Sequence, residues 1–150
     1  MGFVELTIVA QDDNLWDEVC DYARNCSWRA GVSLANRMEK DEFTDWERVI
    51  VARHGEKIVG FCVVSKEDCI PNVAYTPYIS YIFVDQTFRG NRISEKLCSS
   101  AIDYLQQNGF TAAYLVSGEV GLYEKYGFVK IDEQPAFWGA MQSIFVYEMR

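Results

Sequence analysis

The 150-residue chain lacks the unbroken apolar run of about 18 residues or more that a membrane-spanning helix requires. Residues 1–10 contain no basic segment and no small-residue cleavage site, so we expect no secretion signal. Internal repeats, low-complexity tracts and Gly- or Pro-rich linkers are also missing, and the chain has only three prolines. These absences predict one domain over residues 1–150, located in the cytoplasm and without a membrane partner.

Basic residues and histidines are scarce. The chain has 14 Lys and Arg against 22 Asp and Glu, a net charge of −8. Because nonspecific nucleic-acid binders use basic side chains to displace counterions, we expect no nucleic-acid partner. His54 is the only histidine and no CxxC pair exists, so we expect no metal site. We expect five reduced cysteines, several of them buried as small hydrophobes: Cys20, Cys26, Cys62, Cys69 and Cys98.

Hydrophobic residues make up 49% of the chain, as in an ordinary soluble globular domain. Their spacing predicts strands at 3–10, 49–53, 57–64, 78–84, 112–116, 128–131 and 143–149, and helices at about 15–25, 27–38, 93–107 and 122–126. This order predicts an α/β (α+β) fold with a central, mostly antiparallel mixed sheet of about seven strands, flanked by about four helices.

A short polar turn connects the predicted strand 78–84 to the predicted helix 93–107. The first turn of a helix has free N–H groups and the positive end of the helix dipole, which together favour anions. Arg89, Gly90 and Arg92 lie in this turn, and residues 85–96 carry a local charge of +1. The pattern indicates an anion site, although an ordinary strand-to-helix turn with exposed arginines has the same features.

Two sequence blocks resemble a known family. Residues 84–94, VDQTFRGNRIS, resemble the acyl-CoA-binding motif of the GNAT acyltransferase superfamily. Residues 121–128, GLYEKYGF, are similar to its second signature, a tyrosine-bearing short helix followed by Gly-Phe, and the hairpin 49–64 matches the second and third strands of that fold. The chain is identified as a small, bacterial-type, single-domain GNAT member, which implies the GNAT N-acyltransferase fold over residues 1–150.

The resemblance also implies a site for acetyl-CoA, the acyl-donor co-substrate. In the family, amides of the turn bind the coenzyme A pyrophosphate and the preceding strand pairs with the pantetheine arm. The family's motif has glycines where this chain has Arg92 and Ser94, and we expect Arg92 to add a charge-assisted contact to phosphate. The coenzyme-binding residues implied here are Ile82, Phe83, Val84, Arg89, Gly90, Asn91, Arg92, Ile93, Ser94 and Ser117.

Tyr123 matches the family's general acid, a phenol that protonates the departing thiolate. The alternative is a core aromatic, the role that we assign to Tyr126 and Phe128. Glu119 is the nearest plausible carboxylate for a general base; the alternatives are a solvated loop side chain, or a water relay from Tyr78, Ser80 and Tyr81.

The implied activity is transfer of an acetyl group from acetyl-CoA to a primary amine of an unidentified acceptor, a small molecule or peptide, by direct attack in a ternary complex. A non-catalytic coenzyme-A-binding sensor and a nucleotide-binding domain are the alternatives. The acidic balance favours a cationic amine, and a homodimer through the last strands stays open. Candidates for the acceptor pocket are Trp28, Arg29, Arg37, Met38, the loop 68–78 and Trp138.

Overall fold

The computed structural model of the chain describes residues 3–149, which contain one seven-stranded sheet. Neighbouring strands follow the order β1-β2-β3-β4-β5-β7-β6, and every pair is antiparallel except β4 with β5. The predicted mixed, mostly antiparallel sheet is therefore confirmed. Its strands are β1 (Glu5–Val9), β2 (Arg48–His54), β3 (Lys57–Ser65), β4 (Tyr78–Val84), β5 (Ala112–Ser117), β6 (Val129–Pro135) and β7 (Met141–Glu148).

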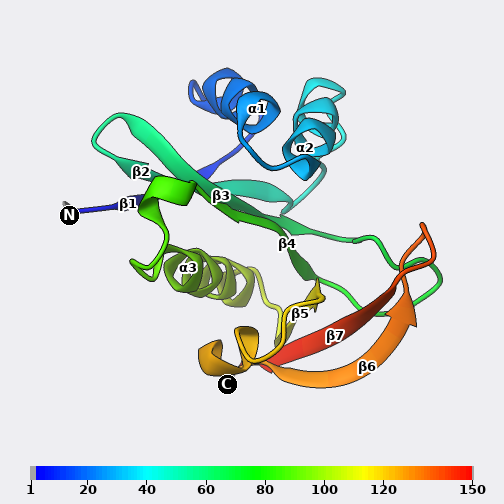
Figure 1. Ribbon diagram of the computed structural model, residues 1–150. Helices are drawn as coiled ribbons and strands as arrows, with labels where there is room; N and C mark the ends of the chain where they lie inside the picture. Colours follow the sequence, from blue (N-terminus) through cyan, green and yellow to red (C-terminus); the bar gives the residue numbers. More distant parts are fainter. Residues whose placement is uncertain (1–2, 150) are drawn as a thin grey trace.

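Three α-helices cover the two faces of the sheet (Figure 1). The first two, α1 (Trp16–Asn25) and α2 (Ala30–Glu39), pack on one face, and α3 (Ile93–Gln107) packs on the other. Two short 3-10 helices, η1 (Gln86–Phe88) and η2 (Tyr123–Tyr126), complete the described elements. The fourth predicted helix is thus a 3-10 turn, because Gly127 ends it in a left-handed conformation (φ 95°) after four residues. None of the helices in the described range is long and apolar enough to cross a membrane.

Strands β2 and β3 are apolar on both faces because each face is covered. Val49 and Val51 contact the core beneath α1 and α2, whereas Ile50 and Ala52 contact the core beneath α3. The alternation of side chains along one strand therefore supplies both hydrophobic cores. This explains the continuous apolar run in the sequence at this position.

Two predicted boundaries were wrong by three residues or more. Helix α2 begins at Ala30, not at residue 27, because the backbone at Cys26 is extended and Trp28 turns inward to stack on Phe83 of β4. Strand β6 continues from the predicted residue 131 to Pro135, because its polar second half pairs through the backbone with β7 at the sheet edge.

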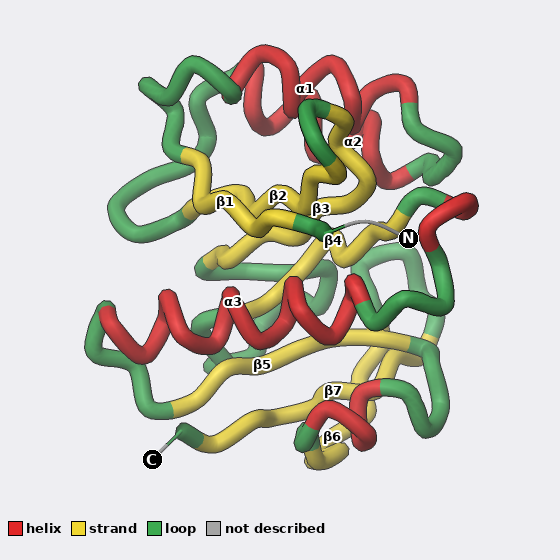
Figure 2. The backbone as a smooth tube through the Cα atoms, turned by 90° about the vertical axis from the view of Figure 1, so that its left-hand side faces the viewer, coloured by secondary structure: helices red, strands yellow, loops and turns green. Residues whose placement is uncertain are grey.

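The two halves of the sheet separate after the start of β4. In the described sheet, β4 pairs with β5 at Tyr78 and Tyr114 alone. A bulge follows in β4, where Tyr81 has a φ of 49° and the register with β3 shifts. Figure 2 shows α3 between the β1–β4 half and the β5–β7–β6 half, and α3 contacts strands from both halves. This separation creates the space that contains the candidate site.

Candidate active site

A cleft of about 1590 Å³ opens where β4 and β5 part. Its walls come from the α1–α2 connection, β4, the turn before α3, the end of β5, η2 and the β6–β7 hairpin. Of the catalytic and coenzyme-binding residues predicted from the sequence, only Asn91 is not in the lining. Its side-chain amide instead donates to the carbonyls of Phe88 (3.0 Å) and Arg89 (3.3 Å), so it braces the turn. The predicted residues that line the cleft are Ile82, Phe83, Val84, Arg89, Gly90, Arg92, Ile93, Ser94, Ser117, Glu119 and Tyr123.

The turn before α3 presents a row of free backbone N–H groups. Within the described part of the chain, the N–H groups of residues 90–95 donate to no acceptor. Gly90 (φ 85°) and Arg92 (φ 61°) are both left-handed, which turns successive amides toward a common concave side. The Nε of Arg89 donates to the Val84 carbonyl (3.1 Å) and fixes the turn to the end of β4. This arrangement can bind an anion through the backbone.

The two departures from glycine have different structural consequences. Arg92 occupies the left-handed position before α3, a conformation that costs a non-glycine residue about 1–2 kcal/mol. Its side chain is 83% exposed, with Nη1 3.9 Å from the Glu95 carboxylate, and so is free to meet a ligand. Ser94 lies within hydrogen-bonding distance (2.7 Å) of the Tyr126 hydroxyl, which ties the turn to η2. Tyr126, which we assigned to packing, therefore also has a polar contact at the cleft, whereas Phe128 is buried as expected.

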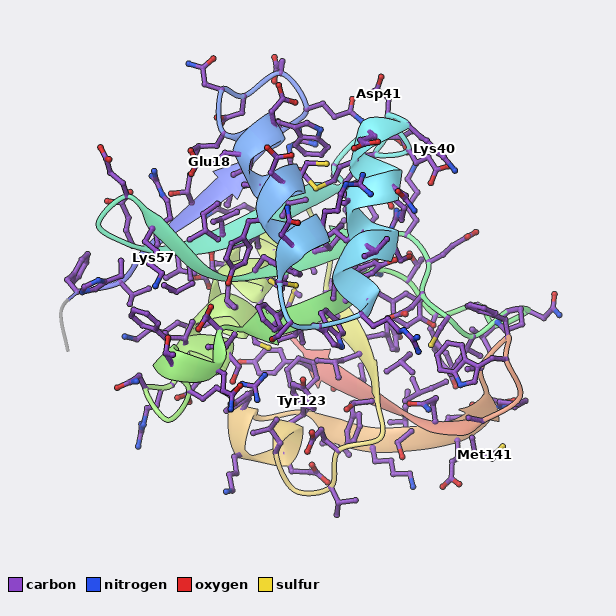
Figure 3. All side chains as sticks on the ribbon, turned by 45° about the horizontal axis from the view of Figure 1, so that its top comes forward. Glu18, Lys40, Asp41, Lys57, Tyr123 and Met141 are labelled. Carbon is purple, nitrogen blue, oxygen red and sulfur yellow. The ribbon has the colours of Figure 1, made fainter. Side chains whose placement is uncertain are left out.

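Tyr123 combines the two roles that the sequence left open. Its ring is 7% exposed and packs against the rings of Tyr126 (5.8 Å), Phe128 (6.3 Å) and Phe145 (6.1 Å). Its hydroxyl has no hydrogen-bond partner among residues 3–149 and is not sealed from solvent, so it faces the cleft that the residue lines. Burial raises the pKa of the Tyr123 phenol, which keeps it protonated at neutral pH. Figure 3 shows Tyr123 near one end of the β6–β7 hairpin and Met141 near the other.

Glu119 and Ser117 lie on the same side of the cleft as Tyr123. The side chain of Glu119 is exposed, and its negative charge contributes to the raised pKa of Tyr123. The Ser117 hydroxyl accepts the Glu119 backbone N–H (2.9 Å), so it shapes the end of β5. Among the proposed relay groups, the hydroxyls of Ser80 and Tyr81 are occupied by Ser65 (3.0 Å) and Ser33 (2.9 Å) respectively.

The other end of the cleft has aromatic and acidic walls. Trp28 stacks on Phe83, with ring centroids 5.9 Å apart and planes 4° from parallel. Trp28, Arg37, Asp68 and Trp138 line the cleft as predicted for an acceptor pocket. Met38 was wrongly predicted here, because it points into the core under α2 and is 1% exposed. Arg29 precedes α2 and does not line the cleft.

Glu47 is a buried carboxylate in this wall that sequence reasoning missed. Its Oε1 accepts the Thr44 backbone N–H (3.0 Å), and its Oε2 accepts the Lys66 backbone N–H (2.8 Å). The Arg37 guanidinium lies 3.8 Å from the same Oε2. Glu47 therefore joins α2, the start of β2 and the end of β3. The local sequence shows only a polar residue before a strand, so no local signal could have identified it.

Known proteins resemble this chain in sequence. Residues 15–128 match the profile of the acetyltransferase (GNAT) family. The chain is 35% identical over 75 residues to N-alpha-acetyltransferase 30 from Saccharomyces cerevisiae, a match that covers 47% of this chain and 43% of that protein. The chain thus spans less than half the length of this relative.

Solved structures with the same architecture include two acetyltransferases. Aminoglycoside 6'-acetyltransferase type Ii superposes with a TM-score of 0.72 at 19% identity, covering 96% of each chain. A GNAT family acetyltransferase from Elizabethkingia anophelis, solved with acetyl-CoA bound, superposes with a TM-score of 0.67 at 16% identity, covering 97% of this chain and 98% of that one. At these identities the likeness shows the fold, and it confirms the fold predicted from the sequence.

Proposed function

Because the chain belongs to the acetyltransferase (GNAT) family, we propose that it transfers the acetyl group of acetyl-CoA to a primary amine by direct attack in a ternary complex. One observation carries this proposal. The free N–H groups of residues 90–95, the part of β4 that has separated from β5, and Tyr123 all border one cleft. An anion cradle, a strand edge and a phenol are the three groups that this reaction requires.

The turn before α3 suits the pyrophosphate of coenzyme A. Its consecutive free amides and the positive end of the α3 dipole favour a doubly charged group. Arg92 adds an exposed cation beside the cradle. The segment Ile82, Phe83 and Val84 borders the cleft beyond the point where β4 leaves β5, so its backbone can pair with the peptide-like pantetheine arm.

Catalysis at the reaction centre depends on the positioning of the two substrates and on one proton donor. Backbone amides near Val84 would polarise the thioester carbonyl. The Tyr123 phenol, kept protonated by burial, would protonate the departing thiolate. Glu119 stays a candidate base on this side of the cleft. The alternative function is a sensor that binds coenzyme A without turnover.

The first experiment measures thermal unfolding of the protein with saturating acetyl-CoA, with ATP and NAD as controls. A ligand at about 100 times its Kd stabilises the folded state by about 2.7 kcal/mol. For a domain of this size we expect a rise in Tm of about 5–10 °C with acetyl-CoA alone. Absence of that rise at millimolar acetyl-CoA would contradict the proposed coenzyme site. A rise without release of coenzyme A thiol on addition of any amine would favour the sensor.

A further inference from the structure

Asp68 lies at the end of the cleft opposite the turn before α3, in the loop that follows β3. It is half-buried in the cleft wall. The next residue, Cys69, accepts the backbone N–H of Phe137 at its carbonyl (2.9 Å). This bond joins the β3–β4 loop to the tip of the β6–β7 hairpin, which meet on one side of the molecule in Figure 1. Asp68 therefore belongs to a wall built from two distant segments.

The carboxylate of Asp68 forms no ion pair with any described residue. Its Oδ1 accepts the Cys69 backbone N–H (2.6 Å). The two basic residues of this wall have other partners: Arg37 lies against Glu47 (3.8 Å), and Lys66 pairs with Asp45 (2.6 Å). A half-buried carboxylate whose hydrogen bonds come only from the backbone and side chain of Cys69 can accept further donors from a ligand.

A hydroxyl at the start of β4 also lacks a partner. The Tyr78 hydroxyl is sealed from solvent and forms no hydrogen bond with any described residue. Burial raises the pKa of Tyr78 to about 12, and the charge of Asp68 contributes to that rise. Tyr78 does not line the cleft, so a ligand in the cleft would contact Asp68 and not this hydroxyl.

Aromatic side chains border the same end of the cleft. Trp28 and Tyr81 form one side, with ring centroids 6.2 Å apart and planes at 72°. Phe137 and Trp138 form the hairpin side, where they remain 76% and 58% exposed with perpendicular rings 4.9 Å apart. Faces of such rings attract cations. An unpaired carboxylate among aromatic rings suits an ammonium ion and repels an anionic amine.

We propose that Asp68 binds the ammonium group of the acceptor and takes its proton, and that the acceptor is a cationic amine; this inference rests on the proposed acetyltransferase function. The proton passes from the ammonium nitrogen to the Asp68 carboxylate, which leaves the nitrogen lone pair free. That nitrogen then bonds to the carbonyl carbon of acetyl-CoA, the carbon–sulfur bond breaks, and the thiolate takes the Tyr123 proton. The acylated nitrogen loses its second proton to the Tyr123 phenolate, which restores the phenol and leaves a neutral amide.

The titration of Asp68 agrees with this role. Burial raises its pKa to about 6, against the lowering effects of the Cys69 hydrogen bond and of the Arg37 charge. The groups that face it are Arg37 from α2, Tyr78 from β4, and Cys69 in its own loop. A higher carboxyl pKa narrows the gap to that of an ammonium ion, which makes proton transfer less unfavourable. Since the base must be ionised, turnover rises with pH through about 6 and then levels off.

Glu119 occupies a different position. Its carboxylate is exposed and lies on the Tyr123 side, where the leaving thiolate must be protonated. Asp68 and Tyr123 instead come from different segments of the cleft wall, the β3–β4 loop and η2, so base and acid belong to separate parts of the chain.

The test compares Asp68→Asn with wild type and with Asp103→Asn, which removes an exposed carboxylate from α3 outside the cleft. The donor is saturating acetyl-CoA, and the acceptor probes are spermidine, an aminoglycoside, a lysine-containing peptide amide and glutamate. Release of coenzyme A thiol is followed from pH 5 to pH 9, a range chosen to span about 6. Binding of the cationic probes to the complex with coenzyme A is measured by calorimetry.

We expect wild type to use at least one cationic probe in preference to glutamate. Asp68→Asn should lower kcat/KM for that probe by about 100-fold, weaken its binding and remove the low-pH limb. The acetyl-CoA shift in Tm should be unchanged in both variants, and Asp103→Asn should keep full turnover. Asp68→Glu restores the carboxylate and should recover part of the activity. This recovery would show that the loss in Asp68→Asn does not come from a folding defect.

Three outcomes overturn the inference. They are preference for glutamate, turnover by Asp68→Asn within threefold of wild type at about pH 7, or wild type neither binding nor acetylating any of the cationic probes. In each of these cases, a normal rise in Tm with acetyl-CoA would still support the proposed coenzyme site. Loss of the shift in wild type would refute the proposed function itself.

Discussion

The two ends of the cleft are built in different ways. The proposed coenzyme end takes its cradle from one continuous segment, residues 82–95, and offers backbone N–H groups. The acceptor end combines the α1–α2 connection, the β3–β4 loop and the β6–β7 hairpin, and offers side chains. The charged residues that line the coenzyme end are Arg89, Arg92, Lys125, Glu95 and Glu119, and those of the acceptor end are Arg37, Lys66, Glu42, Glu47, Glu67 and Asp68.

This comparison has a physical consequence. Backbone amides recognise the charge of a phosphate whatever side chains surround them, so the coenzyme end can lose two glycines and keep its cradle. The acceptor end depends on the identity of individual side chains and on the packing that holds three segments together. Substitutions should therefore affect the two ends separately.

Tyr123 stands between the two ends, and its hydroxyl should have the largest single effect on turnover. Tyr123→Phe should lower kcat by about 100-fold or more, because the thiolate then departs without its proton donor. Stability and acetyl-CoA affinity should stay near wild type, since the hydroxyl has no partner among the described residues and the ring keeps its contacts. Steady-state kinetics with saturating acetyl-CoA and a productive amine measure this effect.

Tyr104→Phe is the matched control. That hydroxyl donates to the Trp46 carbonyl (2.8 Å) away from the cleft, so its loss should cost about 1 kcal/mol of stability and leave kcat unchanged. If Tyr123→Phe keeps kcat within a factor of two of wild type, another group protonates the thiolate.

Gly31→Ala should perturb the acceptor end through its scaffold. A Cβ at this position would lie 2.1 Å from the Ala23 carbonyl oxygen and 2.7 Å from the Cys26 sulfur, so α2 must move away from α1. We expect a loss of about 1–3 kcal/mol in the free energy of unfolding, measured by urea denaturation. The rise in Tm on addition of acetyl-CoA should persist, since the cradle before α3 is not part of this contact.

Gly118→Ala is the comparison for that variant, since its Cβ would meet only Gln142 at an ordinary 3.8 Å. Its stability should change by less than about 1 kcal/mol. Loss of the acetyl-CoA shift in Gly31→Ala would show that the two ends are coupled through the sheet.

The same contrast explains what could be predicted from the sequence. Strand β4 and helix α3 begin and end where predicted, because a run of aromatic and β-branched residues and a helical repeat closed by Asn108-Gly109 are strong local signals. The coenzyme end lies between these two elements, so its residues could be named from local pattern and family resemblance together. The start of α2 could not be predicted, because stacking of Trp28 on Phe83 overrides the local helical pattern.

The acceptor end was only partly predictable, for the same reason. Glu47 acquires its role by accepting the Lys66 backbone N–H, and Cys69 meets Phe137 from a distant part of the chain. Asp68 was only one member of a predicted loop, since its burial and its missing ion pair arise from tertiary packing. Contacts between distant segments leave no periodicity or spacing in the sequence.

Of these variants, Arg92→Gly should have the smallest effect. It tests whether any side chain contributes to coenzyme binding. Glycine relieves the left-handed strain of about 1 kcal/mol, but it also makes the unfolded chain more flexible by a similar amount, so stability should change little. The exposed guanidinium contributes at most about 1 kcal/mol to binding, so the Kd for acetyl-CoA should rise by about two- to fivefold.

Varying the ionic strength distinguishes the effect of the Arg92 charge on coenzyme binding from the effect of the backbone shape of the turn. Salt screens the full charge of an exposed cation more than it affects hydrogen bonds from neutral backbone amides, so the difference in Kd between wild type and Arg92→Gly should shrink as salt is raised. Calorimetry with acetyl-CoA at two salt concentrations measures this difference. If the variant binds as tightly as wild type at low salt, the backbone alone recognises the pyrophosphate. If it binds more tightly, the arginine hinders access to a cradle that glycine would open, and its place in the turn then has to be explained by something other than coenzyme affinity.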